Sequence, residues 1–358
     1  MKYVYPILLL LLLASCQKEE KIVDHKKSDW AFYELNGNIE DISLRSYALN
    51  EKGEKGEHKA ETSAGFDYDM HFNDEGKLTL EKKFVKDGVL YEESTYSERK
   101  NRLNTTQYMQ GKPMVKVEYL WDKAGNNTML TKRNPDNSQL SREEKKYKDT
   151  LMVEKIQYNV QDIPFDKVTY EYDKKGNLIK ENIFLREETI QFVTSYRYDE
   201  KNRKIEETSH DGKGNFIYRT NFEFNGDKLA SVETIDSDEK TLVKIDKYTY
   251  DNNGNRVKEY SFRTADKLET VEDYTYNENN KRTSWVLTQN NELKAKITFS
   301  YDEKGNLTES ITTDSKDNQL EAVSYAYEYD TKGNWVKKTV RRNDAPFVVV
   351  ERKITYYN

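Results

Sequence analysis

The chain has 358 residues, of which 35% are hydrophobic and 34% charged, and its mean hydropathy is -1.02. This composition excludes a large aliphatic core, while 27 tyrosines and 13 phenylalanines argue against disorder, because disordered chains contain few aromatic residues. The 58 basic residues nearly balance the 64 acidic ones, and a net charge of -6 excludes the basic excess that a nucleic-acid-binding protein uses against phosphates. The sequence therefore predicts a fold held by regularly placed aromatic residues, and no nucleic-acid partner.

The N-terminal residues have the pattern of an export signal, which ends at the only cysteine of the chain. Lys2 precedes an apolar run from Ile7 to Ala14, which is too short to span a bilayer, since spanning takes about 20 residues. This pattern predicts a signal peptide over residues 1–15. The run ends in Leu-Ala-Ser-Cys, which resembles the lipobox of bacterial lipoproteins, and the resemblance implies that Cys16 is acylated and anchors the protein in a membrane. The alternative is a chance cysteine beside an ordinary cleavage site.

Residues 16–29 follow as a charged segment without aromatic residues, and we expect a solvated tether. Its opening residues, Gln17, Lys18, Glu19 and Glu20, resemble the lysine-plus-acidic signal that carries lipoproteins of one Gram-negative group to the cell surface. The resemblance implies an outer-membrane lipoprotein exposed on the cell surface, and the alternative is retention in the periplasm.

A repeat of about 26 residues fills the rest of the chain, residues 30–358. Each clear copy reads aromatic, any residue, aromatic, Asp or Asn, two polar residues, then Gly or Asn. The second aromatic falls at 172, 198, 224, 250, 276, 301 and 329, and weaker copies are anchored at Phe72, Tyr96, Trp121, Tyr147 and Tyr356. The pattern predicts about twelve units, with Trp30 to Ser46 as a degenerate first unit.

Each unit has the residues of a β-hairpin. In one clear copy, Asp173 can accept backbone hydrogen bonds and Gly176 suits the left-handed position of the turn. Asn202 and Asn280 replace this glycine elsewhere, as expected where φ is positive. Further turn pairs, such as Asp87-Gly88, lie halfway between the anchors, so each unit contains two antiparallel strands.

The paired aromatics of each unit share one face of the sheet, because residues two apart in a strand point the same way. Tyr170 and Tyr172 are one such pair. A long aromatic face has to be covered, so we expect most of these rings to be buried. We therefore predict an all-β fold, in which antiparallel hairpin repeats form one long coiled sheet, a solenoid or an open shell. Closure into a tube is left open.

The unit resembles the YD repeat of the Rhs family over nearly the whole expected mature chain. In that family, such repeats form a spiralling β-sheet shell around a cargo, usually a C-terminal toxin, and they are often described as carbohydrate-binding. This sequence ends on a repeat anchor at Tyr356, so we expect repeats only, without a toxin domain.

No catalytic constellation is evident in the sequence. His25, His58, His71 and His210 have no metal-ligand spacing, and Cys16 is assigned to lipid, so we expect no metal, no cofactor and no enzymatic activity. The recurrent aspartates are explained by the turns.

Trp285 is the one candidate ligand contact. It occupies the ninth position after its anchor, where sibling units carry Glu181, Glu207, Glu259 and Lys338. Either this column is exposed, or a bulge shifts the phase and buries Trp285. Together these features favour a non-enzymatic, lipid-anchored surface protein that binds a glycan or another surface protein; the alternative is a structural or assembly role related to Rhs shells.

Overall fold

The computed structural model describes residues 25–59, 66–97, 101–186 and 188–357. Cys16 and the predicted surface-export signal Gln17 to Glu20 lie outside these ranges. Within them, no helix is long and apolar enough to cross a membrane.

The described chain is almost entirely antiparallel β-structure, as the repeat predicts. Two short 3-10 turns (His25–Lys27 and Lys86–Gly88) and one short helix, α1 (Asp29–Phe32), accompany the strands. The strands are β1 (Ile39–Leu49), β2 (Lys55–His58), β3 (Asp67–Phe72), β4 (Leu78–Val85), β5 (Val89–Tyr96), β6 (Arg102–Met109), β7 (Lys112–Trp121), β8 (Asn127–Arg133), β9 (Gln139–Lys148), β10 (Leu151–Tyr158), β11 (Pro164–Tyr172), β12 (Leu178–Leu185), β13 (Thr189–Tyr198), β14 (Lys204–Asp211), β15 (Phe216–Asn225), β16 (Lys228–Ile235), β17 (Leu242–Tyr250), β18 (Arg256–Arg263), β19 (Leu268–Tyr276), β20 (Arg282–Gln289), β21 (Glu292–Tyr301), β22 (Leu307–Thr313), β23 (Gln319–Tyr329), β24 (Trp335–Arg342) and β25 (Ala345–Tyr356).

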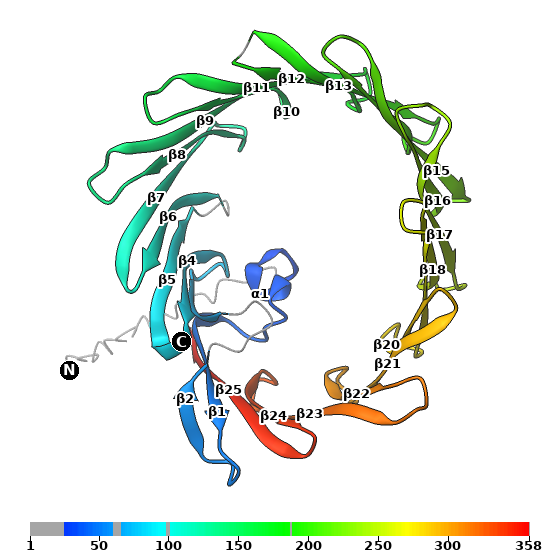
Figure 1. Cartoon of the computed structure of the whole chain (residues 1–358). Coiled ribbons are helices and arrows are strands. Elements are labelled where there is room, and N and C mark those ends of the chain that lie inside the picture. The colour runs from blue at the N-terminus through cyan, green and yellow to red at the C-terminus, as the bar shows by residue number, and fades with distance from the viewer. Residues whose placement is uncertain (1–24, 60–65, 98–100, 187, 358) are drawn as a thin grey trace, which may run out of the picture.

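The sheet closes on itself into a β-barrel, which we call the ring (Figure 1). From β3 to β25 each strand pairs with the next, and β1 pairs with both β25 and β3, while β2 pairs with β1 beside the ring. Ile42 of β1 lies opposite Ile354 on one side and Met70 on the other. The predicted solenoid or open shell is therefore wrong. The physical reason is that β1 supplies a partner for the last strand, so neither end of the sheet is left with an unpaired edge.

The turns confirm the hairpin chemistry read from the sequence. Asp173 Oδ1 accepts hydrogen bonds from the backbone N–H groups of Lys175 and Asn177, at 2.8 and 2.9 Å. Gly176 has a φ of 86°, and Asn202 takes the same left-handed position in its own unit with a φ of 61°. The repeated Asp therefore organises the turn, and the repeated Gly or Asn completes it.

A hydrogen bond from the second anchor aromatic joins each of several units to the one before it. The hydroxyl of Tyr198 donates to the backbone carbonyl of Leu178, at the start of β12, where the pairing of β11 with β12 shifts by one residue. Such a shift removes backbone groups from the regular ladder. Equivalent hydrogen bonds run from a tyrosine hydroxyl to a backbone carbonyl in four other units, at 2.7 to 3.0 Å: Tyr147 to Asn127, Tyr172 to Met152, Tyr276 to Arg256 and Tyr301 to Arg282. In the unit anchored by Trp121, the indole N–H takes the place of the tyrosine hydroxyl and donates to the backbone carbonyl of Arg102 at 2.8 Å.

The first residues of the described chain do not form the degenerate repeat unit that the sequence predicts over Trp30 to Ser46, because α1 and a loop precede β1. Trp30 belongs to α1, which lies inside the ring beside β4 (Figure 1). Its side chain is 0% exposed, its indole N–H donates to the carbonyl of Ile39 at 2.9 Å, and its ring packs against Phe72. Gly76 leaves room for this ring, because a Cβ there would lie 2.6 Å from Trp30. The segment is thus an internal cap on the β3–β4 hairpin.

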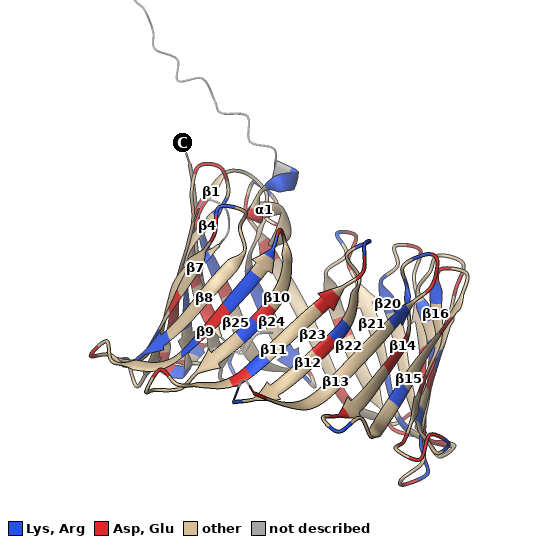
Figure 2. Cartoon of the chain, turned by 90° about the horizontal axis from the view of Figure 1, so that it is seen from above, with Lys and Arg blue, Asp and Glu red and all other residues tan. Residues whose placement is uncertain are grey.

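The two walls of the ring are defined by the position of α1. Met70 and Phe72 pack in the same cluster as Trp30, so their face of the sheet is the inner one, which we call the lumenal wall. Directly opposed residues of antiparallel strands share a face. The strand pairings therefore place further aromatic residues on the lumenal wall, namely Tyr170, Tyr196, Tyr248 and Tyr274. The residues between the paired aromatics form the outer wall, and charged residues follow the strands (Figure 2).

The anchor aromatics are less buried than we expected. Phe72 and Tyr274 are 0% and 6% exposed, but the others on the lumenal wall are half-buried, including Trp121, Tyr170 and Tyr172. The hydrophobic cluster that α1 completes is confined to β1, β3, β4 and the end of β25 with their neighbours. The ladder therefore faces inward without being covered along most of the ring.

The tyrosine hydrogen bonds predict a measurable difference between two positions of one column. Replacing Tyr276 by Phe removes the bond to the Arg256 carbonyl and is expected to lower the free energy of unfolding by about 1 kcal/mol. Tyr250 is the matched control, because its hydroxyl makes no hydrogen bond to the described residues, and Tyr250→Phe is expected to change stability little. Urea denaturation of both variants measures the difference, and equal losses would contradict this role for the hydroxyl.

Candidate ligand-binding site

The lumenal wall combines half-buried aromatic rings with charged side chains. Opposite the first anchor tyrosine of several units stands a glutamate, as in the pairs Tyr170 with Glu181, Tyr196 with Glu207 and Tyr248 with Glu259. Cations lie over many of the rings; Arg256 Cζ, for example, is 5.5 Å from the centroid of Tyr248. Rings flanked by polar groups of both signs offer apolar contact and hydrogen bonds in one surface, which is what a polar ligand with apolar faces requires.

The charges of this wall are partly shielded from water. Burial, followed by a 2.8 Å hydrogen bond to Glu207, raises the pKa of Tyr218 to about 12. The second carboxylate oxygen of Glu207 accepts a 2.8 Å hydrogen bond from Lys204. Burial raises the pKa of Glu181, and the charge of Glu207 adds to the effect while Lys155 opposes it. Polar interactions with a ligand would therefore be stronger here than on the outer wall.

Trp285, the candidate predicted from the sequence, lies on the lumenal wall. It stands directly opposite Tyr274, and the register shift between these strands falls later, at Tyr276. No bulge is needed to turn Trp285 inward, because its whole column faces the lumen. The side chain is half-buried, and its indole N–H donates to Glu272 Oε2 at 2.7 Å, where the hydroxyl of Tyr274 also donates, at 2.6 Å. Trp285 is thus held by its neighbours at the lumenal surface.

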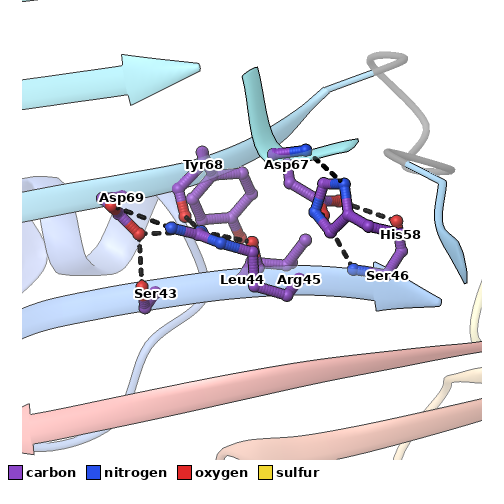
Figure 3. Close-up of polar contacts among 9 residues, drawn as sticks. Ser43, Leu44, Arg45, Ser46, His58, Asp67, Tyr68 and Asp69 are labelled. Carbon is purple, nitrogen blue, oxygen red and sulfur yellow. Dashed lines mark hydrogen bonds and ion pairs between the residues drawn. The ribbon is translucent and has the colours of Figure 1, made fainter. Parts of the chain in front are cut away.

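A second polar cluster, which the sequence alone does not predict, lies where β1, β2 and β3 meet (Figure 3). Asp67 is fully buried; it accepts hydrogen bonds from the backbone N–H and the hydroxyl of Ser46, both at 2.8 Å, and its carboxylate lies 2.6 Å from His58 Nε2. The backbone N–H of Gly88 donates to His58 Nδ1 at 2.9 Å. Aspartate stands between serine and histidine, so this arrangement cannot pass a proton from the serine hydroxyl to the imidazole, as nucleophilic catalysis needs. It instead fixes β2 against the ring.

The remaining histidines are dispersed. His71 Nδ1 lies 2.8 Å from Asp41 on the outer wall, and His210 packs edge-on against Phe216. Across the described residues, no three His, Cys, Asp or Glu side chains are grouped to hold a metal ion.

An outer groove of about 380 Å³ runs along the seam between β1, β3 and β25. Its carboxylates already have partners: Asp69 forms a 2.8 Å ion pair with Arg45, and Asp41 accepts from Thr355 as well as contacting His71. The groove therefore presents satisfied polar groups.

Comparison with known proteins gives only distant structural likenesses. No family model matches the chain, and no curated protein matches it. The crystal structure of TcdB2-TccC3 without its hypervariable C-terminal region aligns with a TM-score of 0.39 and 11% identity, over 83% of this chain and 19% of that chain. TcdB2-TccC3-TEV aligns with a TM-score of 0.35 and 10% identity, over 85% and 22%. A porin-like protein from Bacteroides uniformis ATCC 8492 aligns with a TM-score of 0.25 and 12% identity, over 89% and 99%.

This chain thus spans about a fifth of the length of the TcdB2-TccC3 chains that it matches. At these TM-scores and identities, the fold is defined by its own strand pairings, and the resemblance to YD repeats stays a prediction from the sequence.

Proposed function

We propose that this protein is a non-enzymatic, lipid-anchored protein of the cell surface whose lumenal wall binds a glycan. The observation that carries the proposal is the repetition of half-buried aromatic rings, each beside charged or hydroxyl side chains, around the inner face of a closed ring. Sugars present apolar ring faces and peripheral hydroxyls, and both find partners on such a wall.

The charges of the outer wall support a ring that lies in water and is attached to the membrane only through a lipid anchor. Ion pairs cross the strands on this face, including Arg197 with Glu206 at 3.1 Å and Lys337 with Glu328 at 2.7 Å. Placing such charges against hydrocarbon costs about 2 to 4 kcal/mol for each Arg or Lys at the bilayer midplane. Membrane attachment is therefore assigned to acylated Cys16, with Gln17 to Glu20 directing the protein to the surface.

The turn aspartates support a non-enzymatic role. Asp251, for example, accepts backbone hydrogen bonds from Asn253 and Asn255 and a third from the amide of Asn255, and these lower its pKa. A carboxylate that accepts these hydrogen bonds within its turn remains ionised, and it therefore has no proton to donate as a general acid.

A structural or assembly role is the second candidate. It is favoured by the placement of α1, since a ring that encloses a segment of its own chain resembles a shell around a cargo. Co-purification with a neighbouring secreted protein, without sugar binding, would favour this role.

A glycan array tests the proposed function. The protein is expected to bind a defined glycan class, and Trp285→Ala is expected to weaken that binding by about tenfold, because it removes a lumenal aromatic ring and exposes Glu272. Tyr260→Ala is the matched control, since Tyr260 lies on the outer wall opposite Lys247, and its loss is expected to leave binding unchanged. No binding to any glycan would contradict the proposal, and so would equal losses in the two variants.

Fractionation of cells tests the anchor. Cys16→Ala is expected to release the protein from membranes, because the acylated residue is lost. Changing Lys18, Glu19 and Glu20 to Ala is expected to leave the protein in the membrane fraction but to abolish its cleavage by protease added to intact cells. Persistence of the Cys16→Ala protein in membranes would contradict lipid anchoring.

A further inference from the structure

A pocket of about 290 Å³ opens on the lumenal wall beside the seam of the ring. The loop that follows α1 forms one side, and the region from the β21–β22 turn to β25 forms the other; Lys304, Tyr329, Trp335 and Arg352 are among the lining residues. Arg352 faces the lumen because it stands opposite Leu44, which in turn stands opposite Tyr68 on the inner face. We call this the seam pocket.

Arg352 carries a half-buried charge that forms no ion pair within the described part of the chain. Its guanidinium stacks on Trp335, with Cζ 3.5 Å from the ring centroid. Nη2 donates one long hydrogen bond, 3.4 Å, to the hydroxyl of Tyr68, and the buried Nε has no hydrogen-bond partner among the described residues. Burial lowers the pKa of Arg352. Tyr68 opposes this shift, and so, after it, does the nearby Glu34, which forms no ion pair with Arg352.

Two lysines add to the positive charge. Lys338 Nζ lies 5.7 Å from the centroid of Trp335, and burial, together with the charge of Arg352, lowers the pKa of Lys338. Lys304 Nζ lies 3.4 Å from the centroid of Tyr329. Three cations thus meet over two aromatic rings, and within the described residues none of them forms an ion pair.

The nearest turn carboxylates are already engaged. Asp302 accepts the backbone N–H groups of Lys304 and Asn306, and Asp330 accepts those of Lys332 and Asn334 as well as the hydroxyl of Tyr356. They organise their own turns. Glu34, which also lines the pocket, is a single carboxylate against three cations, so the site keeps a net positive charge.

Buried cations are costly unless an anion pairs with them, and a guanidinium stacked on an aromatic ring keeps its in-plane N–H groups available for a carboxylate or sulfate. We propose that the seam pocket binds the carboxylate or sulfate group of an acidic saccharide, with Arg352 as the principal partner and Lys304 at the mouth. The inference rests on the proposed glycan-binding function, because the sugar ring would extend from the pocket along the aromatic lumenal wall.

Calorimetric titration of the full-length protein tests this inference, with cellobiouronic acid as the acidic probe and cellobiose as its neutral match. The acid is expected to bind at least about tenfold more tightly than cellobiose, and Arg352→Gln is expected to abolish that difference by weakening the binding of the acid. Arg256→Gln is the matched control: Arg256 also lies over lumenal rings but is paired with Glu259 at 3.0 Å, so its loss is expected to preserve the preference.

Thermal melting shows whether the variant folds and separates the outcomes. Without ligand, Arg352→Gln is expected to melt no lower than the wild type, because it removes a half-buried charge that has no ion-pair partner among the described residues. Equal affinity for the two disaccharides, unaffected by Arg352→Gln, would overturn the acidic preference while the glycan-binding function stands. Stabilisation of the wild type by inorganic sulfate, with no binding of either disaccharide, would overturn the saccharide assignment and the proposed function with it.

Discussion

The double pairing of β1 is the constraint on which the rest of the structure depends. Because β1 joins β25 on one side and β3 on the other, the strands from β3 to β25 close into a ring with β1, and the sheet acquires an inside and an outside. The aromatic column becomes a lumenal wall, α1 is enclosed, and the seam pocket forms where the first and last strands meet. An open sheet of the same units would leave these aromatics on a surface that faces solvent.

The ring is held together with little aliphatic core. Hydroxyl groups of the repeated tyrosines bind carbonyls that the strand bulges release, so each tyrosine contributes both an apolar ring and a hydrogen bond. Ion pairs cross neighbouring strands of the outer wall, and cations lie over rings on the lumenal wall. This explains how a chain with a mean hydropathy of -1.02 folds into one continuous sheet. The same polar inner face supports the proposed binding of a ligand in the lumen.

The local structure could be predicted from the sequence because it depends on local chemistry. Asp173 and Gly176 specify their turn whatever surrounds it, and the spacing of Tyr170 and Tyr172 assigns them to one face. Closure could not be predicted, because it depends on pairing between residues about 300 positions apart, and β1 carries no signature of its partner. The seam pocket was missed for the same reason, since Glu34, Lys304 and Arg352 are brought together only by closure. Trp285 stands out in the sequence because it departs from the repeat, but only the strand register shows that it lies on the lumenal wall.

Cross-linking across the seam tests closure most directly. Asp41 and Thr355 are opposite each other on the outer wall, and Thr355 Oγ1 donates to Asp41 Oδ2 at 3.1 Å. The double variant Asp41→Cys, Thr355→Cys is therefore expected to form an intramolecular disulfide, seen as faster migration of the monomer on a non-reducing gel. Asp41→Cys combined with Glu206→Cys, a residue of the outer wall on β14, is expected to form none, and the single variants control for Cys16. Cross-links found only between two chains, or none in a folded double variant, would contradict the closed ring.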